Sequence, residues 1–311
     1  MKNLRYMCAQ PANDYYTWQV EVVIHNFIKH GINPNNLDIV CSIPEGSSIP
    51  ENWITLANTY NYVRFFFYED TRKNSPYISS IRPNILKKHF KKYPSLKDEI
   101  IFYFDCDMIF TRPPDWSKFV NDDIWYCSDT RFYIGAEYIK SKGFGIYEKM
   151  CEIVKIPENI PQENESNSGG AQYMMKNIDH TYWEKVEHDS DALYQYFLDH
   201  LVEHPETPEY HAIQKWTADM WAVLWNAWYF GHEVRTPPEL EFSWGTCGVD
   251  NWQKNTIYHN AGVLDAEKEK YFYKGQYNNK IPYNITNHVD PGLASHNYVK
   301  EILETAKKTC L

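Results

Sequence analysis

The sequence lacks several features that mark membrane, secreted or repetitive proteins. No stretch approaches the roughly 20 consecutive apolar residues that a transmembrane helix needs, and the start, MKNLRYMCAQPAND, contains no apolar core of a signal peptide. The seven cysteines show no paired spacing, which disfavours a disulfide framework or a zinc site. Internal repeats and heptads are also missing. We therefore expect a cytoplasmic protein without membrane association, whose thiols are reduced and buried.

Positive charge is in the minority. The 31 Lys and Arg residues face 41 Asp and Glu residues, and the net charge of −10 disfavours a general polyanion binder. Residues 71–97, however, contain eight basic side chains and no acidic one. Lys87, Lys88, Lys91 and Lys92 would share one face of a helix, which makes them a candidate nucleic-acid-binding ridge. The alternative is an ordinary solvated helix face.

The order of apolar segments predicts an α/β fold. Over the first 110 residues, short apolar runs such as NLDIVCSI alternate with helix-like segments such as TWQVEVVIHNFIKH. This alternation predicts a mostly parallel sheet with helices on both faces, in a single large domain over residues 1–311. Further helices are expected at about 136–154, 180–204 and 211–231 and from Asn297, with a flexible polar loop at 157–170.

Two carboxylates follow directly after a predicted strand that is apolar. In IIFYFDCDMIF, residues 100–110, Asp105 and Asp107 follow the last strand of the series. Ligands of such sheets bind at the carboxyl ends of the strands, and two carboxylates separated by one residue suit a divalent metal that also holds phosphates. The alternative is a pair of solvated or capping carboxylates at the strand end.

A set of short motifs extends this pattern along the chain. They are, in order, NDYYTWQ, IRPNIL, DCD, NSGGAQYMM, ADMWA, IYHNAG and YFYKGQY, and they span residues 13–277. In this order they resemble metal-dependent glycosyltransferases of the GT-A type, in particular the plant hydroxyproline O-arabinosyltransferases and serine O-galactosyltransferases. Unlike that family, the start of this sequence does not predict an N-terminal membrane anchor. It also resembles the DNA arabinosyltransferases of T-even-like bacteriophages.

The resemblance implies a Rossmann-like GT-A fold and a role for particular residues. It implies that residues 1–110 bind the nucleotide sugar and that residues 111–311 bind the acceptor. Asp105, Asp107 and His259 would hold Mn²⁺ or Mg²⁺, and Asp219 would be catalytic, facing the sugar and the acceptor. The expected substrate-binding residues are Ala9, Gln10, Trp18, Gln19, Arg82, Asn167, Gly169, Gly170, Ala171 and Lys274.

Each of these residues could instead have a purely structural role. His259 could be a core or surface histidine, and Lys274 and Arg82 could be surface cations. Asp219 could be a helix N-terminal carboxylate favoured by the helix dipole. Trp18 could be a core residue of an amphipathic first helix, and NSGGA a flexible turn.

The expected function follows from the resemblance. It is the transfer of a sugar, with L-arabinose as the leading candidate, from a UDP-sugar to a hydroxyl, with retention. The leading acceptor is 5-hydroxymethylcytosine in phage DNA, which would place the protein in the host cytoplasm. The alternatives are a protein O-glycosyltransferase that acts on hydroxyproline or serine, and a non-catalytic sugar- or nucleic-acid-binding module. No protein partner is implied.

Overall fold

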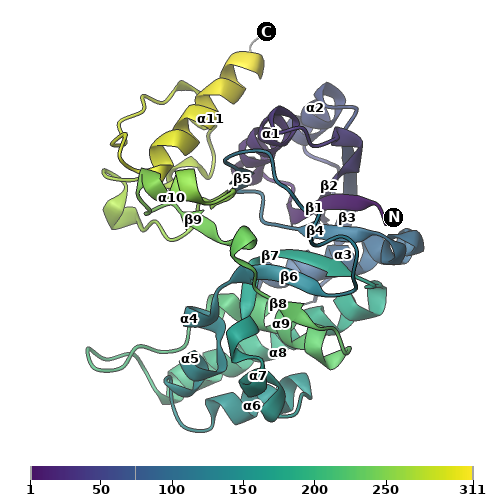
Figure 1. The fold of residues 1–311 in the computed structure, drawn as a ribbon, viewed down its shortest axis with the longest axis vertical. Helices are drawn as coiled ribbons and strands as arrows, with labels where there is room; N and C mark the ends of the chain where they lie inside the picture. Colours follow the sequence, from purple (N-terminus) through teal and green to yellow (C-terminus); the bar gives the residue numbers. More distant parts are fainter. Residues whose placement is uncertain (1, 74, 310–311) are drawn as a thin grey trace. The chain divides into compact units, whose positions relative to one another are not determined.

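The computed structural model describes residues 2–73 and 75–309, which divide into two compact units. Unit 1 comprises Met1–Leu4, Tyr68–Tyr103 and Phe119–Pro238, and unit 2 comprises Arg5–Phe67, Phe104–Lys118 and Glu239–Leu311. Each unit therefore combines segments that are distant in the sequence (Figure 1). The single domain, with a donor-binding part up to residue 110 and an acceptor-binding part after it, stays a prediction.

The strands confirm the predicted α/β fold. A seven-stranded sheet includes β3 (Arg64–Asp70), β2 (Leu37–Pro44) and β1 (Leu4–Pro11) in that order, with β1 parallel to β2. Within unit 1 the order is β4 (Ile100–Tyr103), β7 (Gly169–Lys176), β6 (Trp125–Asp129) and β8 (Val234–Arg235). Strand β7 is antiparallel to β4 and β6, whereas β6 is parallel to β8. In unit 1, β4, β6 and β8 therefore share one direction.

Burial explains why these strands are largely apolar. All four residues of β4 are buried, and so is every residue of β2 except the last. Because successive side chains of a strand point to opposite faces, burial along the whole strand means that both faces are covered. This is the pattern that the continuous apolar runs predict.

Unit 2 contains a second, three-stranded sheet in the order β5 (Met108–Phe110), β10 (Ile257–His259) and β9 (Phe242–Trp244). Helix α1 (Asp14–Lys29) begins at Asn13, whose side chain accepts a hydrogen bond from the Tyr16 N–H at 3.4 Å. Helix α1 packs against β5, α2 (Glu51–Thr59) and α11 (Ala294–Thr309). Helix α10 (Val249–Lys254) also packs against α11.

In unit 1, α8 (His180–Glu203) contacts both α3 (Ile81–Lys92) and α9 (Ala218–Tyr229). The structure corrects several predicted boundaries. The helix expected at 136–154 is two helices, α5 (Ala136–Lys140) and α6 (Ile146–Val154), because Gly143 and Gly145 between them have positive φ. The helix expected from residue 211 begins at Ala218, and the terminal helix begins at Ala294 rather than Asn297.

The prediction of a flexible loop at residues 157–170 was wrong. This segment contains α7 (Asn159–Glu163), a 3₁₀ turn at Glu165–Asn167 and the start of β7; the short α4 (Arg131–Ile134) lies close in unit 1. The carboxylate of Glu165 accepts a hydrogen bond from the Ala136 N–H at 2.6 Å, which fastens the segment to the first residue of α5. Its polar composition thus serves local hydrogen bonding.

Six cysteines fall among the described residues; all six are free thiols and five are buried, as predicted. Cys310 lies outside the described residues. Among the residues that the structure describes, no helix combines the length and hydrophobicity of a bilayer-spanning segment.

Candidate active site

The Asp105–Asp107 turn joins β4 to β5 and is held by backbone hydrogen bonds. The Phe104 N–H donates to the Met7 carbonyl at 3.1 Å, and the Met108 N–H donates across the turn to the Asp105 carbonyl at 2.9 Å. Phe104 and Met108 are fully buried, so the apolar side chains on either side anchor the turn. The Asp107 side chain is 6% exposed and that of Asp105 is 27% exposed. The two carboxylates therefore differ in their access to solvent.

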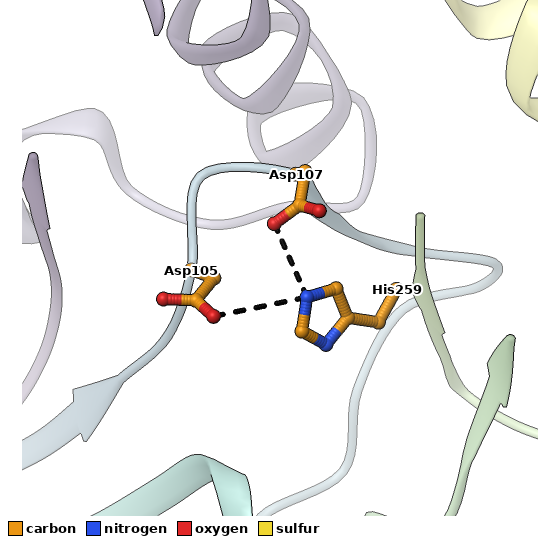
Figure 2. A group of neighbouring side chains, drawn as sticks. All are labelled: Asp105, Asp107 and His259. Atoms are coloured by element: carbon orange, nitrogen blue, oxygen red, sulfur yellow. Dashed lines mark ion pairs between the residues drawn. The ribbon is translucent and has the colours of Figure 1, made fainter. Parts of the chain in front are cut away.

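Strand pairing brings His259 to these carboxylates. His259 ends β10 and lies opposite Met108 of the antiparallel strand β5, while the Asn260 N–H donates to the Asp107 carbonyl at 3.0 Å. The His259 Nε2 lies 3.2 Å from Asp107 Oδ1 and 3.8 Å from Asp105 Oδ2, as Figure 2 shows. One ligand atom from each residue lies within 4.8 Å of the other two. The predicted metal ligands are thus neighbours in unit 2.

The donor set of this cluster fits a divalent cation. Two carboxylate oxygens and one imidazole nitrogen suit Mn²⁺ and tolerate Mg²⁺. Within residues 2–73 and 75–309, this is the one group of three or more His, Cys, Asp or Glu side chains close enough to share an ion. A bound divalent cation would also offset the free-energy cost of burying the Asp107 carboxylate beside a second carboxylate.

Lys274, at the start of a 3₁₀ turn (Lys274–Tyr277), forms an ion pair with Oδ2 of Asp107. Burial alone would raise the pKa of Asp107, but the charges of Lys274 and His259 hold it well below its usual range. Burial would lower the pKa of Lys274, and the charge of Asp107 raises it instead. Lys274 is therefore a fixed positive charge beside the carboxylate cluster at neutral pH.

Tyr15, on the first turn of α1, is a neighbour that the sequence did not single out. Burial raises the pKa of its hydroxyl, and the charge of Lys274 lowers it in part. Tyr15 belongs to the NDYYTWQ motif, one helical turn before Trp18 and Gln19, and this position is the signal that could have found it.

The other predicted donor-binding residues of unit 2 lie in its core. Ala9 and Gln10 lie near the end of β1 and are 5% and 1% exposed. The Gln10 amide donates to the Val40 carbonyl at 3.4 Å, while its Oε1 is buried without a hydrogen-bond partner among the described residues. Trp18 is fully buried and packs edge-on against Phe272. Gln19, 1% exposed, donates to the Tyr15 carbonyl at 2.5 Å. Their contact with a donor stays a prediction.

In unit 1, Asp219 lies in the first turn of α9, where two side chains meet its carboxylate. Arg82 Nη1 is 3.0 Å from Oδ2, and the Tyr77 hydroxyl is 2.6 Å from Oδ1. The Asp219 N–H also donates to the Tyr77 hydroxyl at 3.1 Å. Burial and the charge of Asp219 raise the pKa of Tyr77 well above its usual value, so its hydroxyl keeps its proton. Arg82 thus forms an ion pair with Asp219. A role of Arg82 at a diphosphate stays a prediction.

The Asn167–Ala171 segment approaches the same helix. Asn167 ends the 3₁₀ turn, and Gly169 and Gly170 begin β7. A Cβ atom on Gly169 would lie 2.4 Å from the Ser128 carbonyl oxygen, so no side chain fits there, and a Cβ atom on Gly170 would lie 2.5 Å from Met220 Cε, so Met220 would have to move. The pairing of β6 with β7 is irregular at this point, and Ala171 has a φ of 66°. Irregular strands with such backbone angles are common beside functional sites.

The four lysines of α3 divide into two pairs. Lys87 Nζ lies 2.5 Å from Glu187 Oε2, and Lys88 Nζ donates to the Glu69 carbonyl at 2.5 Å. Lys91 and Lys92 are exposed, and Lys92 also lies over the ring of Tyr93 at 5.5 Å. The structure thus gives Lys87 and Lys88 internal contacts, and only Lys91 and Lys92 of the four are exposed. Nucleic-acid binding by this helix stays a prediction.

Comparisons with known proteins define the fold. No family model matches the chain, and no curated protein matches its sequence. The apo structure of the bifunctional glycosyltransferase WbbM matches 98% of this chain at a TM-score of 0.51 and 10% identity, and the chain covers 50% of WbbM. Mouse xyloside xylosyltransferase 1 matches 85% of this chain and 99% of its own, at a TM-score of 0.42 and 10% identity.

A glycosyltransferase involved in glycosylation of the PBCV-1 major capsid matches 86% of this chain and 96% of its own, at a TM-score of 0.39 and 12% identity. At such low identity the likeness to WbbM concerns the fold alone. The chain therefore shares its α/β fold with WbbM, and this agrees with the predicted fold class.

Replacing Tyr77 by Phe is expected to lower the free energy of unfolding by about 1–3 kcal/mol. The change removes the hydroxyl that donates to Asp219 and accepts from its N–H, and it leaves a buried carboxylate with one partner fewer. Denaturant unfolding measures the loss. Tyr194→Phe is the matched control, because Tyr194 stacks on Tyr77 at 4.5 Å and keeps its ring in the variant. Equal stability of Tyr77→Phe and the parent would contradict the role of this hydroxyl.

Proposed function

We propose that this protein is a metal-dependent glycosyltransferase that transfers a sugar from a UDP-sugar to a hydroxyl acceptor. The observation that carries the proposal is the cluster of Asp105, Asp107 and His259, with Lys274 beside it, on a fold shared with a glycosyltransferase. A non-catalytic binding module would not require two carboxylates, one of them buried, together with an imidazole and the Lys274 ammonium group in one place.

The residues of unit 2 have separate roles in this proposal. Asp105, Asp107 and His259 would hold the divalent cation, which supplies positive charge to the donor diphosphate when bound. Lys274 contributes a second positive charge that does not depend on pH near neutrality, and it stabilises the negative charge that develops as UDP leaves. Asp107 orients Lys274 through their ion pair.

The residues of unit 1 are proposed to act on the sugar or the acceptor. Asp219 supplies a carboxylate whose direction is fixed by Tyr77 and Arg82. The neighbouring Ser128 carbonyl leaves no room for a side chain at Gly169, the first residue of β7. In this proposal the carboxylate of Asp219 orients the sugar or the acceptor hydroxyl, and transfer proceeds with retention.

The leading donor is UDP-L-arabinose and the leading acceptor is 5-hydroxymethylcytosine in DNA, by the resemblance to phage DNA arabinosyltransferases. The proposed location is then the host cytoplasm. Incubation with several UDP-sugars, and with either hydroxymethylated DNA or a hydroxyproline peptide, tests both assignments by mass spectrometry of the acceptor. Addition of one pentose to the DNA is expected. Modification of the peptide alone would establish the protein O-glycosyltransferase alternative.

Replacing both Lys91 and Lys92 by Ala is expected to weaken transfer to DNA while UDP-sugar hydrolysis stays unchanged. Each exposed lysine that neutralises a phosphate adds to the salt dependence of binding, so the slope of log affinity against log salt should fall by about 1.8 for the pair. Affinity measured over a series of salt concentrations tests this. The Lys97→Ala variant, which removes one exposed cation beyond α3, is the control. An unchanged slope in the double variant would exclude this helix from DNA binding.

A further inference from the structure

The C-terminal end of α8 carries two histidines that lie side by side. His200 and His204 are four positions apart, and the His204 N–H donates to the His200 carbonyl at 2.8 Å, so the two residues are one helical turn apart. Their ring centroids are separated by 4.7 Å, with 42° between the ring planes. His204 is exposed and His200 is half-buried. The pair therefore lies at the surface of unit 1.

The separation of the two rings fits a shared metal ion. An ion that is about 2.0–2.1 Å from an imidazole nitrogen lies about 3 Å from the centre of that ring. Two imidazoles on adjacent coordination positions of one ion therefore have their ring centres about 5 Å apart. The distance of 4.7 Å between His200 and His204 is close to this value.

Tyr210 determines which nitrogen of His200 carries the proton. The Tyr210 hydroxyl lies 2.9 Å from the Lys142 carbonyl and 3.1 Å from Nε2 of His200. Because a carbonyl can only accept, the single hydroxyl proton goes to Lys142, and the hydroxyl oxygen accepts from Nε2–H. In the neutral ring, Nδ1 then keeps its lone pair. Histidines at metal sites usually bind the ion through one nitrogen and donate the other N–H to a fixed partner.

The charge around the histidines favours a cation. Residues 198–214 contain four acidic side chains and no Lys or Arg. One of the four, Glu203, directly precedes His204 and is exposed. A surface of one charge raises the local concentration of ions of the opposite charge.

We propose that His200 and His204 form a second metal site, which binds a borderline divalent transition metal such as Zn²⁺, with water completing the coordination. Imidazole suits Zn²⁺, Ni²⁺ and Cu²⁺, whereas carboxylate oxygens suit Mn²⁺ and Mg²⁺. This site therefore selects a different class of metal from the Asp105, Asp107 and His259 cluster, and it does not depend on the proposed transfer reaction. The ion fastens the end of α8 and, through Tyr210, the turn from Thr207 to Tyr210, which is closed by backbone hydrogen bonds in both directions.

Calorimetric titration with Zn²⁺ tests this site. The titration is made in an Asp107→Ala background, which removes one ligand of the acidic cluster. In this background His204→Ala is expected to raise the Kd for Zn²⁺ at least tenfold, because even the loss of a partner that only orients a ligand lowers metal affinity by about 10- to 100-fold. His188→Ala is the matched control and should keep the Kd, since His188 is on the same helix, is 75% exposed and has no histidine one turn away.

Thermal unfolding gives a second measurement. Zn²⁺ should raise the Tm of the Asp107→Ala protein by mass action, and it should raise it less when His204→Ala is added. An equal Kd with and without His204, or a Kd weaker than about 1 mM in the Asp107→Ala protein, would overturn the site. Turnover of UDP-sugars with Mn²⁺ is a separate measurement, so this site and the proposed transferase fail independently.

Discussion

Replacing Asp107 by Ala is expected to lower metal-dependent turnover of the UDP-sugar by about 10²- to 10³-fold, which is the scale of the charge stabilisation that a catalytic metal supplies. Asp107 is the best-buried carboxylate of the cluster, and its two oxygens face His259 and Lys274. Its loss removes one metal ligand and also the partner that orients Lys274. The measurement is steady-state release of UDP over a range of Mn²⁺ concentrations.

Two comparisons make this result specific. Asp115→Ala removes an exposed carboxylate from the segment that follows β5, and it should leave turnover unchanged. Asp107→Asn keeps the size of the side chain and should still lose most of the activity, since an amide carries no charge for the cation or for Lys274. Near-parental turnover in both Asp107 variants, with intact thermal unfolding, would show that the cluster does not serve the reaction.

Replacing Asp219 by Asn is expected to lower kcat by about 10²-fold with little change in donor affinity, because a charge that acts at the reacting centre matters chiefly in the transition state. The amide keeps an oxygen that can accept from the Tyr77 hydroxyl, so the position of the side chain should be preserved. The ion pair with Arg82 is lost. Calorimetry of UDP-sugar binding and single-turnover kinetics separate the two effects.

Asp191→Asn is the matched control for Asp219. Asp191 is also a hydrogen-bonded carboxylate of unit 1, and it accepts from the Ser75 hydroxyl at 2.8 Å. Its variant should keep both kcat and donor affinity. If Asp219→Asn has parental kcat, Asp219 is a helix-terminal carboxylate paired with Arg82, the structural alternative that the sequence left open.

The sequence predicted the α/β fold and the position of Asp105 and Asp107 because both depend on local sequence patterns. Continuous apolar runs are typical of strands covered on both faces, and β2 and β4 are such strands. The position of Asp105 and Asp107 at a strand end follows from the same pattern. Their proximity to His259 does not, because it depends on the pairing of β10 with β5, which are far apart in the sequence. Only the resemblance in motif order suggested it.

Local sequence patterns could not predict the contacts of the Asp219 side chain. Tyr77 and Arg82 precede Asp219 by 142 and 137 positions, and no periodicity relates residues around the start of α3 to the start of α9. The family resemblance suggested a diphosphate as the partner of Arg82, and the structure pairs Arg82 with the Asp219 carboxylate. The same holds for Lys87 and Lys88, whose partners come from α8 and from Glu69. Basic residues on a predicted helix face cannot be assigned to a ligand until their internal partners are known.

The most direct test of the account is the metal dependence of donor turnover in the unmodified protein. Release of UDP from UDP-L-arabinose and other UDP-sugars is measured with Mn²⁺, then with excess chelator, and again after Mn²⁺ is restored. We expect release of UDP with Mn²⁺, loss of release to background with chelator, and recovery with added metal. Undiminished release in excess chelator would contradict the assignment of Asp105, Asp107 and His259 as the metal site of a glycosyltransferase.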